Sequence, residues 1–139
     1  MARPEYLQAD DNLARGNYPA ALVKYREVIN LYPQAADRAL FGIGCLYADP
    51  QNPERDYKKS ADAFRQLVKE YPESRHREPS EVILALFAEM TKRDRGTAAL
   101  KKQVETLEKQ IEILQKQSEQ MKEIDRSLEE RRRAVPKRR

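Results

Sequence analysis

Large apolar residues recur at helical spacing in two stretches of the chain. In residues 16–33 they are separated by three or four positions, which places them on one face of a helix: Tyr18, Leu22, Tyr25, Val28, Ile29 and Tyr32. The same pattern returns 39 positions later in residues 56–72, where Tyr57 and Phe64 stand in place of Tyr18 and Tyr25. Each copy ends in a proline, which cannot continue a helix. The repeat predicts stacked helical hairpins rather than one irregular core.

The turn and apolar signals set the expected helix bounds. We expect helices over about residues 4–15, 19–31, 35–47, 57–70 and 79–90. Gly16 suits a turn because it adopts left-handed backbone geometry without a β-carbon clash. Gly44 lies inside the third helix, and a close approach of another helix would explain a glycine there. The helix over 79–90 is expected to be the first half of an incomplete third repeat that closes the end of the array.

The connection before the fourth helix is rich in side-chain oxygens. Its carboxylate and amide residues are Asp49, Asn52, Glu54 and Asp56. Their order lacks the alternation and the closing glutamate of a calcium-binding loop. The two prolines within it favour a rigid turn, so the sequence predicts a structural loop.

After residues 92–96, a charged segment in which we expect a break or a bend, the apolar period changes to a heptad. Its seam positions are Leu100, Val104, Leu107, Ile111, Leu114, Ser118, Met121, Asp125 and Leu128. β-Branched residues at position a and leucines at position d favour two parallel strands. We therefore predict a coiled coil over residues 98–133, about 54 Å long, that makes the protein a homodimer. A helix folded back onto the hairpins is the alternative.

Charge is concentrated at the C-terminus. The chain of 139 residues has a net charge of +4; residues 126–139 contribute +5, so the rest is nearly neutral. The basic residues are Arg126, Arg131, Arg132 and Arg133 and those of the predicted tail, 134–139. A solvated helix end is the simplest interpretation, and contact with an anionic membrane face or an acidic partner is the alternative. Nucleic acid is disfavoured because no aromatic or recognition helix accompanies the charge.

No motif predicts catalysis, a cofactor or a metal. The adjacent Asp10 and Asp11 point to different helix faces, and His76 has no second ligand nearby, so we expect it to be a solvated loop residue. Cys45 lies in an apolar helix and is expected to be a buried, inert thiol. No segment is apolar enough to span a membrane, and the chain contains no signal-peptide pattern.

The first copy resembles tetratricopeptide repeats through Gly16, Tyr18, Ala21, Tyr25 and Pro33, and the second through Ile43, Gly44 and Tyr47. The resemblance implies an all-α fold: a short right-handed array of about two and a half repeats over residues 3–90, followed by the coil. It also implies a protein-binding groove lined by the first helix of each hairpin. Carried over by position, that groove contains Tyr6, Asp10, Leu13, Phe41 and Cys45. The alternative is that Leu13 and Phe41 belong only to the core.

Both copies end on Tyr-Pro, a form similar to the bacterial envelope group that contains BamD-type and YbgF-type proteins. Residues 121–136 are similar to the coiled-coil end of QseG-type outer-membrane lipoproteins, whose partner is a membrane histidine kinase. These resemblances imply a lipoprotein of the periplasm and outer membrane that docks an envelope or membrane protein. The lipid-bearing cysteine of those families is absent from this chain, so membrane contact would need an anchor outside it or the basic tail. A cytoplasmic adaptor that binds a peptide in its groove is the alternative.

Overall fold

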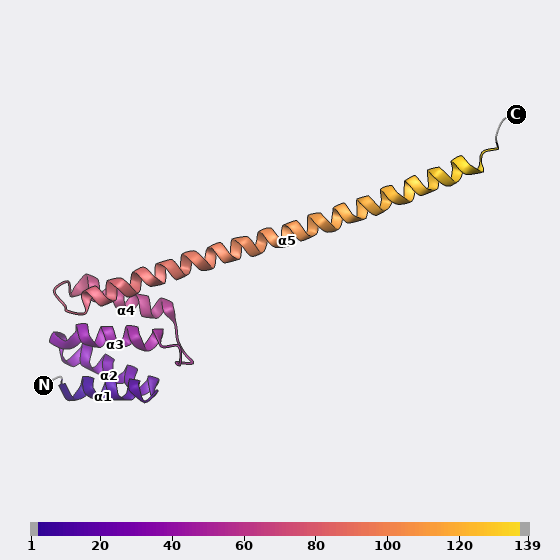
Figure 1. Cartoon of the computed structure of the whole chain (residues 1–139). Helices are drawn as coiled ribbons and strands as arrows, with labels where there is room; N and C mark the ends of the chain where they lie inside the picture. Colours follow the sequence, from indigo (N-terminus) through magenta and orange to yellow (C-terminus); the bar gives the residue numbers. More distant parts are fainter. Residues whose placement is uncertain (1–2, 137–139) are drawn as a thin grey trace. The chain divides into compact units, whose positions relative to one another are not determined.

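The computed structural model describes the backbone of residues 3–136, which is all-α over that range and contains no strand. Its elements are α1 (Arg3–Ala14), α2 (Tyr18–Leu31), the 3-10 helix η1 (Pro33–Ala35), α3 (Ala36–Ala48), α4 (Tyr57–Glu70) and α5 (Arg77–Ala134) (Figure 1). The chain forms two compact units, Met1–Thr91 and Lys92–Arg139. Each is described separately below.

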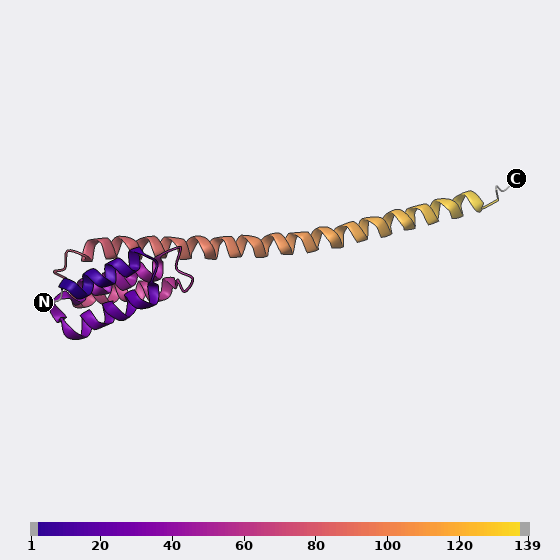
Figure 2. The same cartoon turned by 90° about the horizontal axis from the view of Figure 1, so that it is seen from below.

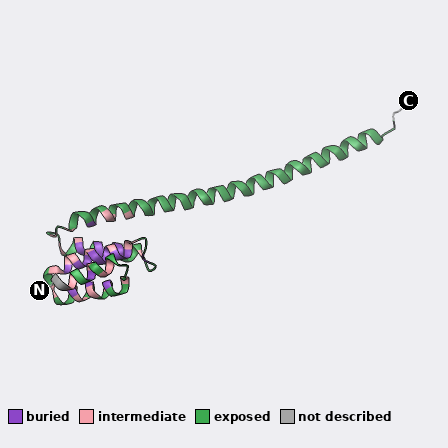
Figure 3. Cartoon of the chain, turned by 60° about the horizontal axis from the view of Figure 1, so that its bottom comes forward, coloured by how far each residue is buried: buried purple, intermediate pink, exposed green. Residues whose placement is uncertain are grey.

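The first four helices of the N-terminal unit pack in chain order, α1 against α2, α2 against α3 and α3 against α4 (Figure 1). Figure 2 shows the same four helices in a view turned by 90°. Tyr25 and Phe64 lie at equivalent places in the two hairpins and are only 1% and 0% exposed. Buried residues gather between the helices and are densest on α3 (Figure 3). The predicted pair of stacked hairpins is therefore the core of this unit.

Two glycines of α3 allow the neighbouring helices to approach closely. A β-carbon on Gly44 would collide with the ring of Phe64, and one on Gly42 would collide with the ring of Tyr25. The approach predicted at Gly44 is confirmed, and the hydroxyl of Ser60 donates a hydrogen bond of 2.6 Å to the Gly44 carbonyl. Gly42 has the same role in the first hairpin and was not singled out in the sequence.

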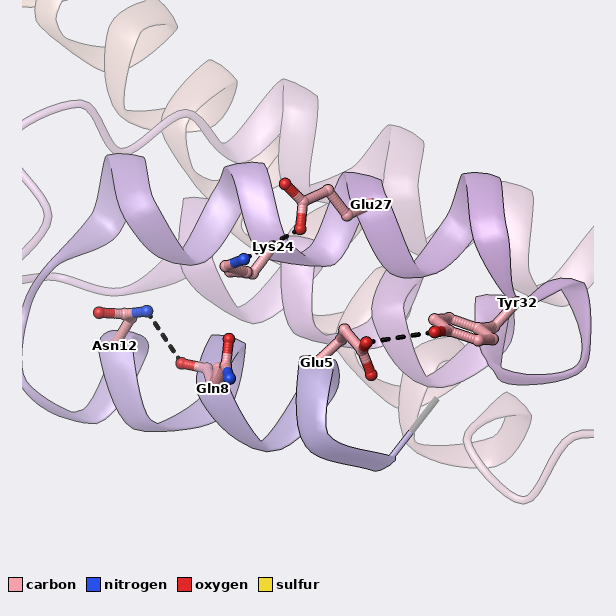
Figure 4. Close-up of polar contacts among 6 residues, drawn as sticks. All are labelled: Glu5, Gln8, Asn12, Lys24, Glu27 and Tyr32. Atoms are coloured by element: carbon pink, nitrogen blue, oxygen red, sulfur yellow. Dashed lines mark hydrogen bonds and ion pairs between the residues drawn. The ribbon is translucent and has the colours of Figure 1, made fainter. Parts of the chain in front are cut away.

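Three tyrosines of α2 and its C-terminal end, seven positions apart, donate hydrogen bonds from their hydroxyls to carboxylates of other elements. Tyr32 donates to Glu5 of α1 at 3.1 Å (Figure 4). The other two bonds are Tyr25 to Asp10, 2.6 Å, and Tyr18 to Asp49, 3.0 Å. These bonds tie α2 to α1 on one side and to the loop after α3 on the other.

The loop between α3 and α4 is a hydrogen-bonded turn, as expected. Asn52 is buried and its side chain donates to the carbonyl of Leu46 at 3.0 Å while accepting from the amide of Glu54 at 2.9 Å. Asp56 caps α4 by accepting from the amides of Lys58 and Lys59. A side-chain acceptor at this position satisfies amides that have no partner inside the helix.

The first turns of α5, up to Thr91, belong to the N-terminal unit. Phe87 packs against Tyr57, with ring centroids 5.4 Å apart, and against Phe64, at 6.5 Å. The outward face carries Val82, Leu86 and Met90, which are 59%, 59% and 43% exposed. Phe87 thus packs on the end of the array, whereas the outer face of this segment is apolar and differs from the polar outer face usual for a terminal cap.

The break predicted at residues 92–96 is wrong, since α5 is helical throughout that segment. Gly96 meets no other atom within 4 Å of an added β-carbon, so nothing requires a glycine there. A single glycine costs about 1 kcal/mol in a helix interior, which a long helix tolerates.

The C-terminal unit is the remainder of α5. Its described residues, 92–136, are all exposed in the single chain, including the seven apolar seam residues. Arg131, Arg132 and Arg133 form its last turn, and residues 137–139 of the predicted tail lie outside the described range. No helix among residues 3–136 has the length and apolar character needed to cross a bilayer.

Candidate functional site

Four of the five predicted groove residues line one cavity of about 270 Å³ in the N-terminal unit. Asp10 and Leu13 come from α1, and Phe41 and Cys45 come from α3. All four are half-buried. Leu13 and Phe41 are thus partly open to solvent, whereas residues that belong only to the core would be fully buried. Tyr6 does not line the cavity.

A charge pair forms the polar part of the cavity. The Asp10 carboxylate accepts a hydrogen bond of 2.9 Å from Nη2 of Arg38, in addition to the bond from Tyr25. The Arg38 guanidinium carbon lies 4.2 Å from the ring centroid of Tyr6. Cation–π stacking of this kind fixes the planar guanidinium over the ring. Tyr6, the fifth predicted residue, therefore contacts Arg38 rather than the cavity and contributes to the site by positioning that side chain.

An aromatic stack forms the apolar part. The ring of His76 lies on the ring of Phe41 with centroids 4.9 Å apart and an interplanar angle of 27°. Phe41 also meets the edge of Phe64 at 5.6 Å. His76 lies in a loop, as expected, but the expectation that it is solvated is wrong, because this residue is half-buried and lines the cavity. Desolvation lowers the pKa of His76, and the nearby Asp37 carboxylate opposes that shift only in part.

Cys45 is half-buried rather than fully buried. Desolvation, reinforced by the negative charge of Asp10, raises the pKa of its thiol to about 11. Because the thiolate is the reactive form of cysteine, the thiol of Cys45 is protonated and unreactive near neutral pH. The inert character expected from the sequence is supported, although the side chain reaches the cavity.

These side chains offer contact surface rather than a closed chamber. Ligand pockets in proteins usually measure about 300–1,000 Å³ and enclose most of the ligand, whereas this cavity is about 270 Å³. The Asp10 carboxylate already accepts hydrogen bonds from Arg38 and Tyr25, and the rings of Phe41 and His76 are half-buried. Such a site suits one anchoring side chain of a larger partner better than a free small molecule.

A second cavity of about 440 Å³ lies where α2, α3 and the loop after α3 meet. Tyr18, Leu22 and Tyr47 line it together with Asn52 and Pro53 of the loop. The side chains of Tyr18 and Asn52 donate to acceptors within the unit. No residue of the predicted groove lines this cavity.

Sequence reasoning missed Arg38, Tyr25 and His76 as members of the site. Phe41 and Cys45 follow Arg38 by three and seven positions, so helical spacing places all three on the same face of α3. The same spacing argument could therefore have identified Arg38. Tyr25 was assigned to the core from its apolar ring, which hid the role of its hydroxyl. His76 belongs to a non-periodic segment after Pro72, and no pattern there indicates that it folds over Phe41.

A comparison with known protein families matches residues 38–74 to the tetratricopeptide repeat. The match covers nearly all of α3, the loop and α4, and it includes Arg38, Phe41 and Cys45 of the cavity. Comparisons with curated proteins and with solved structures gave no match. Residues 38–74 are thus a tetratricopeptide-type repeat, a module that typically binds other proteins and is not itself catalytic.

Proposed function

We propose that this protein is a non-enzymatic protein–protein interaction scaffold of the bacterial cell envelope, associated with the outer membrane, that docks an envelope or membrane protein. The observation that supports the scaffold role is the cavity lined by Asp10, Leu13, Phe41 and Cys45, four of the five residues that the repeat resemblance assigns to the groove. The envelope setting rests on the Tyr-Pro ends of the two copies and on the similarity of residues 121–136.

The cavity has the composition of a binding hot spot. Partner contacts depend on a few aromatic or arginine anchors placed in a desolvated setting. Here Phe41 and His76 supply a stacked aromatic surface, and Arg38 is held over Tyr6. A partner side chain that enters the cavity would contact the aromatic stack and Arg38 without any movement of the helices.

The outward face of the first turns of α5 supplies a second contact area. Val82, Leu86 and Met90 follow one another at four-residue spacing, so they form one exposed apolar row. Contiguous apolar surface on a protein commonly marks an interaction site. The row supports a partner that covers the end of the array as well as entering the cavity.

Self-association through the seam of residues 98–133 completes the proposal. A homodimer presents each docking face twice, which raises avidity for a multivalent partner without any new contact. The arginines at positions 131–133 add positive charge, which favours an anionic membrane face. A lipid anchor outside this chain would also bring the protein to the membrane. The alternative is a cytosolic adaptor that binds a peptide segment in the same groove.

The test is capture of a cross-linked envelope partner by tagged protein, with matched variants. Tyr6→Ala/Phe41→Ala should reduce the amount of captured partner severalfold while the far-ultraviolet circular dichroism is unchanged. The control is Val23→Ala/Leu31→Ala, which removes two exposed apolar side chains of α2 that lie outside the cavity. Charge reversal of Arg131, Arg132 and Arg133 should weaken capture most at low salt.

Equal recovery from the wild type and both groove and tail variants would remove these surfaces from the proposal. Recovery of a cytosolic protein alone, with no envelope partner, would favour the adaptor alternative. A hydrolase, transferase or redox activity in the purified protein would overturn the non-enzymatic role.

A further inference from the structure

The charges beside the seam of the C-terminal unit have an order that the apolar pattern alone does not reveal. With Leu100 and Leu107 at heptad position d, position e is occupied in turn by Lys101, Glu108, Gln115, Lys122 and Glu129. Reflected about Gln115, every charge meets its opposite. Flanking e and g charges set the orientation and partner of a coiled coil, so this order carries information about how two helices align.

We propose that two copies of this chain pair through this unit as an antiparallel coiled coil, with Lys101 facing Glu129 and Glu108 facing Lys122 of the second copy. In an antiparallel pair each e flank faces the e flank of the partner helix. The two-fold symmetry then gives each of these ion pairs twice. The inference rests on the proposed self-association. It replaces the parallel orientation that the a and d residues alone favour, and it adds a register.

The register follows from the same flank. Moving one helix by a heptad in one direction places Lys101 opposite Lys122. Moving it in the other direction places Glu108 opposite Glu129. Like charges in contact disfavour both of these alignments. Only the proposed register places opposite charges against each other along this flank.

A parallel, in-register pair gains nothing from these charges. There, each e residue faces the g residue five positions earlier in the other chain. These residues are uncharged: Gly96, Gln103, Gln117 and Ile124 for Lys101, Glu108, Lys122 and Glu129. At the seam itself, Asp125 at position a would face its own copy, as would Arg132. In the antiparallel register Asp125 lies opposite Leu107, and Arg132 lies opposite Leu100. The antiparallel pair thus avoids two like-charge contacts that the parallel pair must make.

Two kinds of layer in this register are apolar on both sides. Position a of one helix meets position d of the other, which pairs Val104 with Leu128 and Ile111 with Met121, whereas Ser118 lies opposite Leu114. In the single chain the seven apolar seam side chains are between 52% and 66% exposed, and pairing would cover them. From Leu100 to Arg132 the overlap is about 50 Å long.

The charged flank residues are free to make these contacts. Within the described residues, Lys101, Glu108 and Lys122 form no ion pair in the single chain, and Glu129 meets only Arg133 of its own helix at 3.6 Å. Exposed ion pairs are individually weak. The apolar layers therefore supply the affinity, and the charges select orientation and register.

Cross-linking of the full chain distinguishes the two orientations. In a Cys45→Ala background, Gln117→Cys lies beside the two-fold axis of the antiparallel pair, so a short bis-maleimide should couple it to itself. Asp125→Cys should not couple to itself but should couple to a mixed Leu107→Cys chain. Glu105→Cys, on the outer face of the helix, is the control that should not couple. Coupling of Asp125→Cys to itself without coupling of Gln117→Cys would show a parallel pair and overturn the inference.

A charge exchange tests the register independently. Glu108→Lys alone should weaken dimerisation about tenfold or more, because it places lysines opposite each other twice. Adding Lys122→Glu should restore the dissociation constant to within about threefold of the wild type. No restoration would overturn the register. A monomeric wild type in light scattering would refute self-association itself, whereas a dimer with parallel cross-links would refute only the orientation.

Discussion

The ring of Phe64 occupies the space that a β-carbon on Gly44 would need. Gly44→Ala should therefore destabilise the N-terminal unit by about 1–3 kcal/mol, the usual range for overpacking. Gly96→Ala is the matched control, because the same change in a helix with nothing within 4 Å should raise helix stability by about 1 kcal/mol. Chemical denaturation followed by circular dichroism measures both. An unchanged Gly44→Ala protein would contradict the packing of α3 against α4.

The equivalent rings of the two hairpins should be equally indispensable. Tyr25→Ala and Phe64→Ala each leave a large cavity in the core, so each should lower the free energy of unfolding by about 3–5 kcal/mol. Tyr25→Phe keeps the ring and removes only the hydroxyl that donates to Asp10. Its cost should be about 1.5–3 kcal/mol, the range for a hydrogen bond to a charged group. Losses below about 1 kcal/mol for both alanine variants would mean that the hairpins do not stack as described.

His76 should make the N-terminal unit sensitive to acid. Desolvation on Phe41 lowers the pKa of His76 below its ordinary value of 6.5; Asp37 and Asp10 oppose this shift, and Arg75 and Arg38 reinforce it. The folded state therefore binds fewer protons than the unfolded state just below pH 6.5. Stability is lost as the pH falls from about 6.5 through the pKa of the folded state.

His76→Phe keeps a ring over Phe41 and removes the titrating group. Denaturation measured at pH 7 and pH 5 should show a smaller loss of stability for this variant than for the wild type. All other acidic and basic groups are the same in both proteins, so the difference isolates His76. Equal losses would show that the stacking does not perturb the imidazole.

The apolar seam should be required for dimerisation but not for the N-terminal fold. Val104→Lys/Ile111→Lys places charges in layers that are apolar on both sides, opposite Leu128 and Met121, and light scattering should then give the mass of one chain. Far-ultraviolet circular dichroism of the variant should retain the helical signal of the hairpins. Glu105→Lys/Glu112→Lys, which adds the same residue type on the outer face, should remain dimeric. A wild-type protein of one-chain mass would contradict the seam.

The sequence predicted the first four helices well because each carries strong local signals. Pro33 and Pro72 mark helix ends, Gly16 marks a turn, and the large apolar residues between them keep one period. The predicted bounds of 57–70 for the fourth helix agree with α4 at both ends. The matched repeat at residues 38–74 supports the same architecture.

The errors arose where tertiary packing overrides a local signal. Gly96 and its charged neighbours resemble a break, but local propensity is weak against the continuation of a long helix. His76 has no periodic neighbours, so only the folded loop brings it onto Phe41. For the groove, position within the repeat was enough to place Asp10, Leu13, Phe41 and Cys45 together, whereas the polar contacts of Arg38 depend on a partner in another helix.

The hydroxyls of Tyr18, Tyr25 and Tyr32 make the stability of the fold depend on pH in the alkaline range. These three hydroxyls must keep their protons to donate to carboxylates, and the pKa of each is raised: by desolvation first at Tyr18 and Tyr25, and by the hydrogen bond to Glu5 first at Tyr32. The stabilisation they provide is complete below the unfolded value of 10.0 and is lost as the pH rises through the folded values. Deprotonation would set phenolate against carboxylate at three places along one helix, so strong base should loosen α2 from α1 and from the loop after α3.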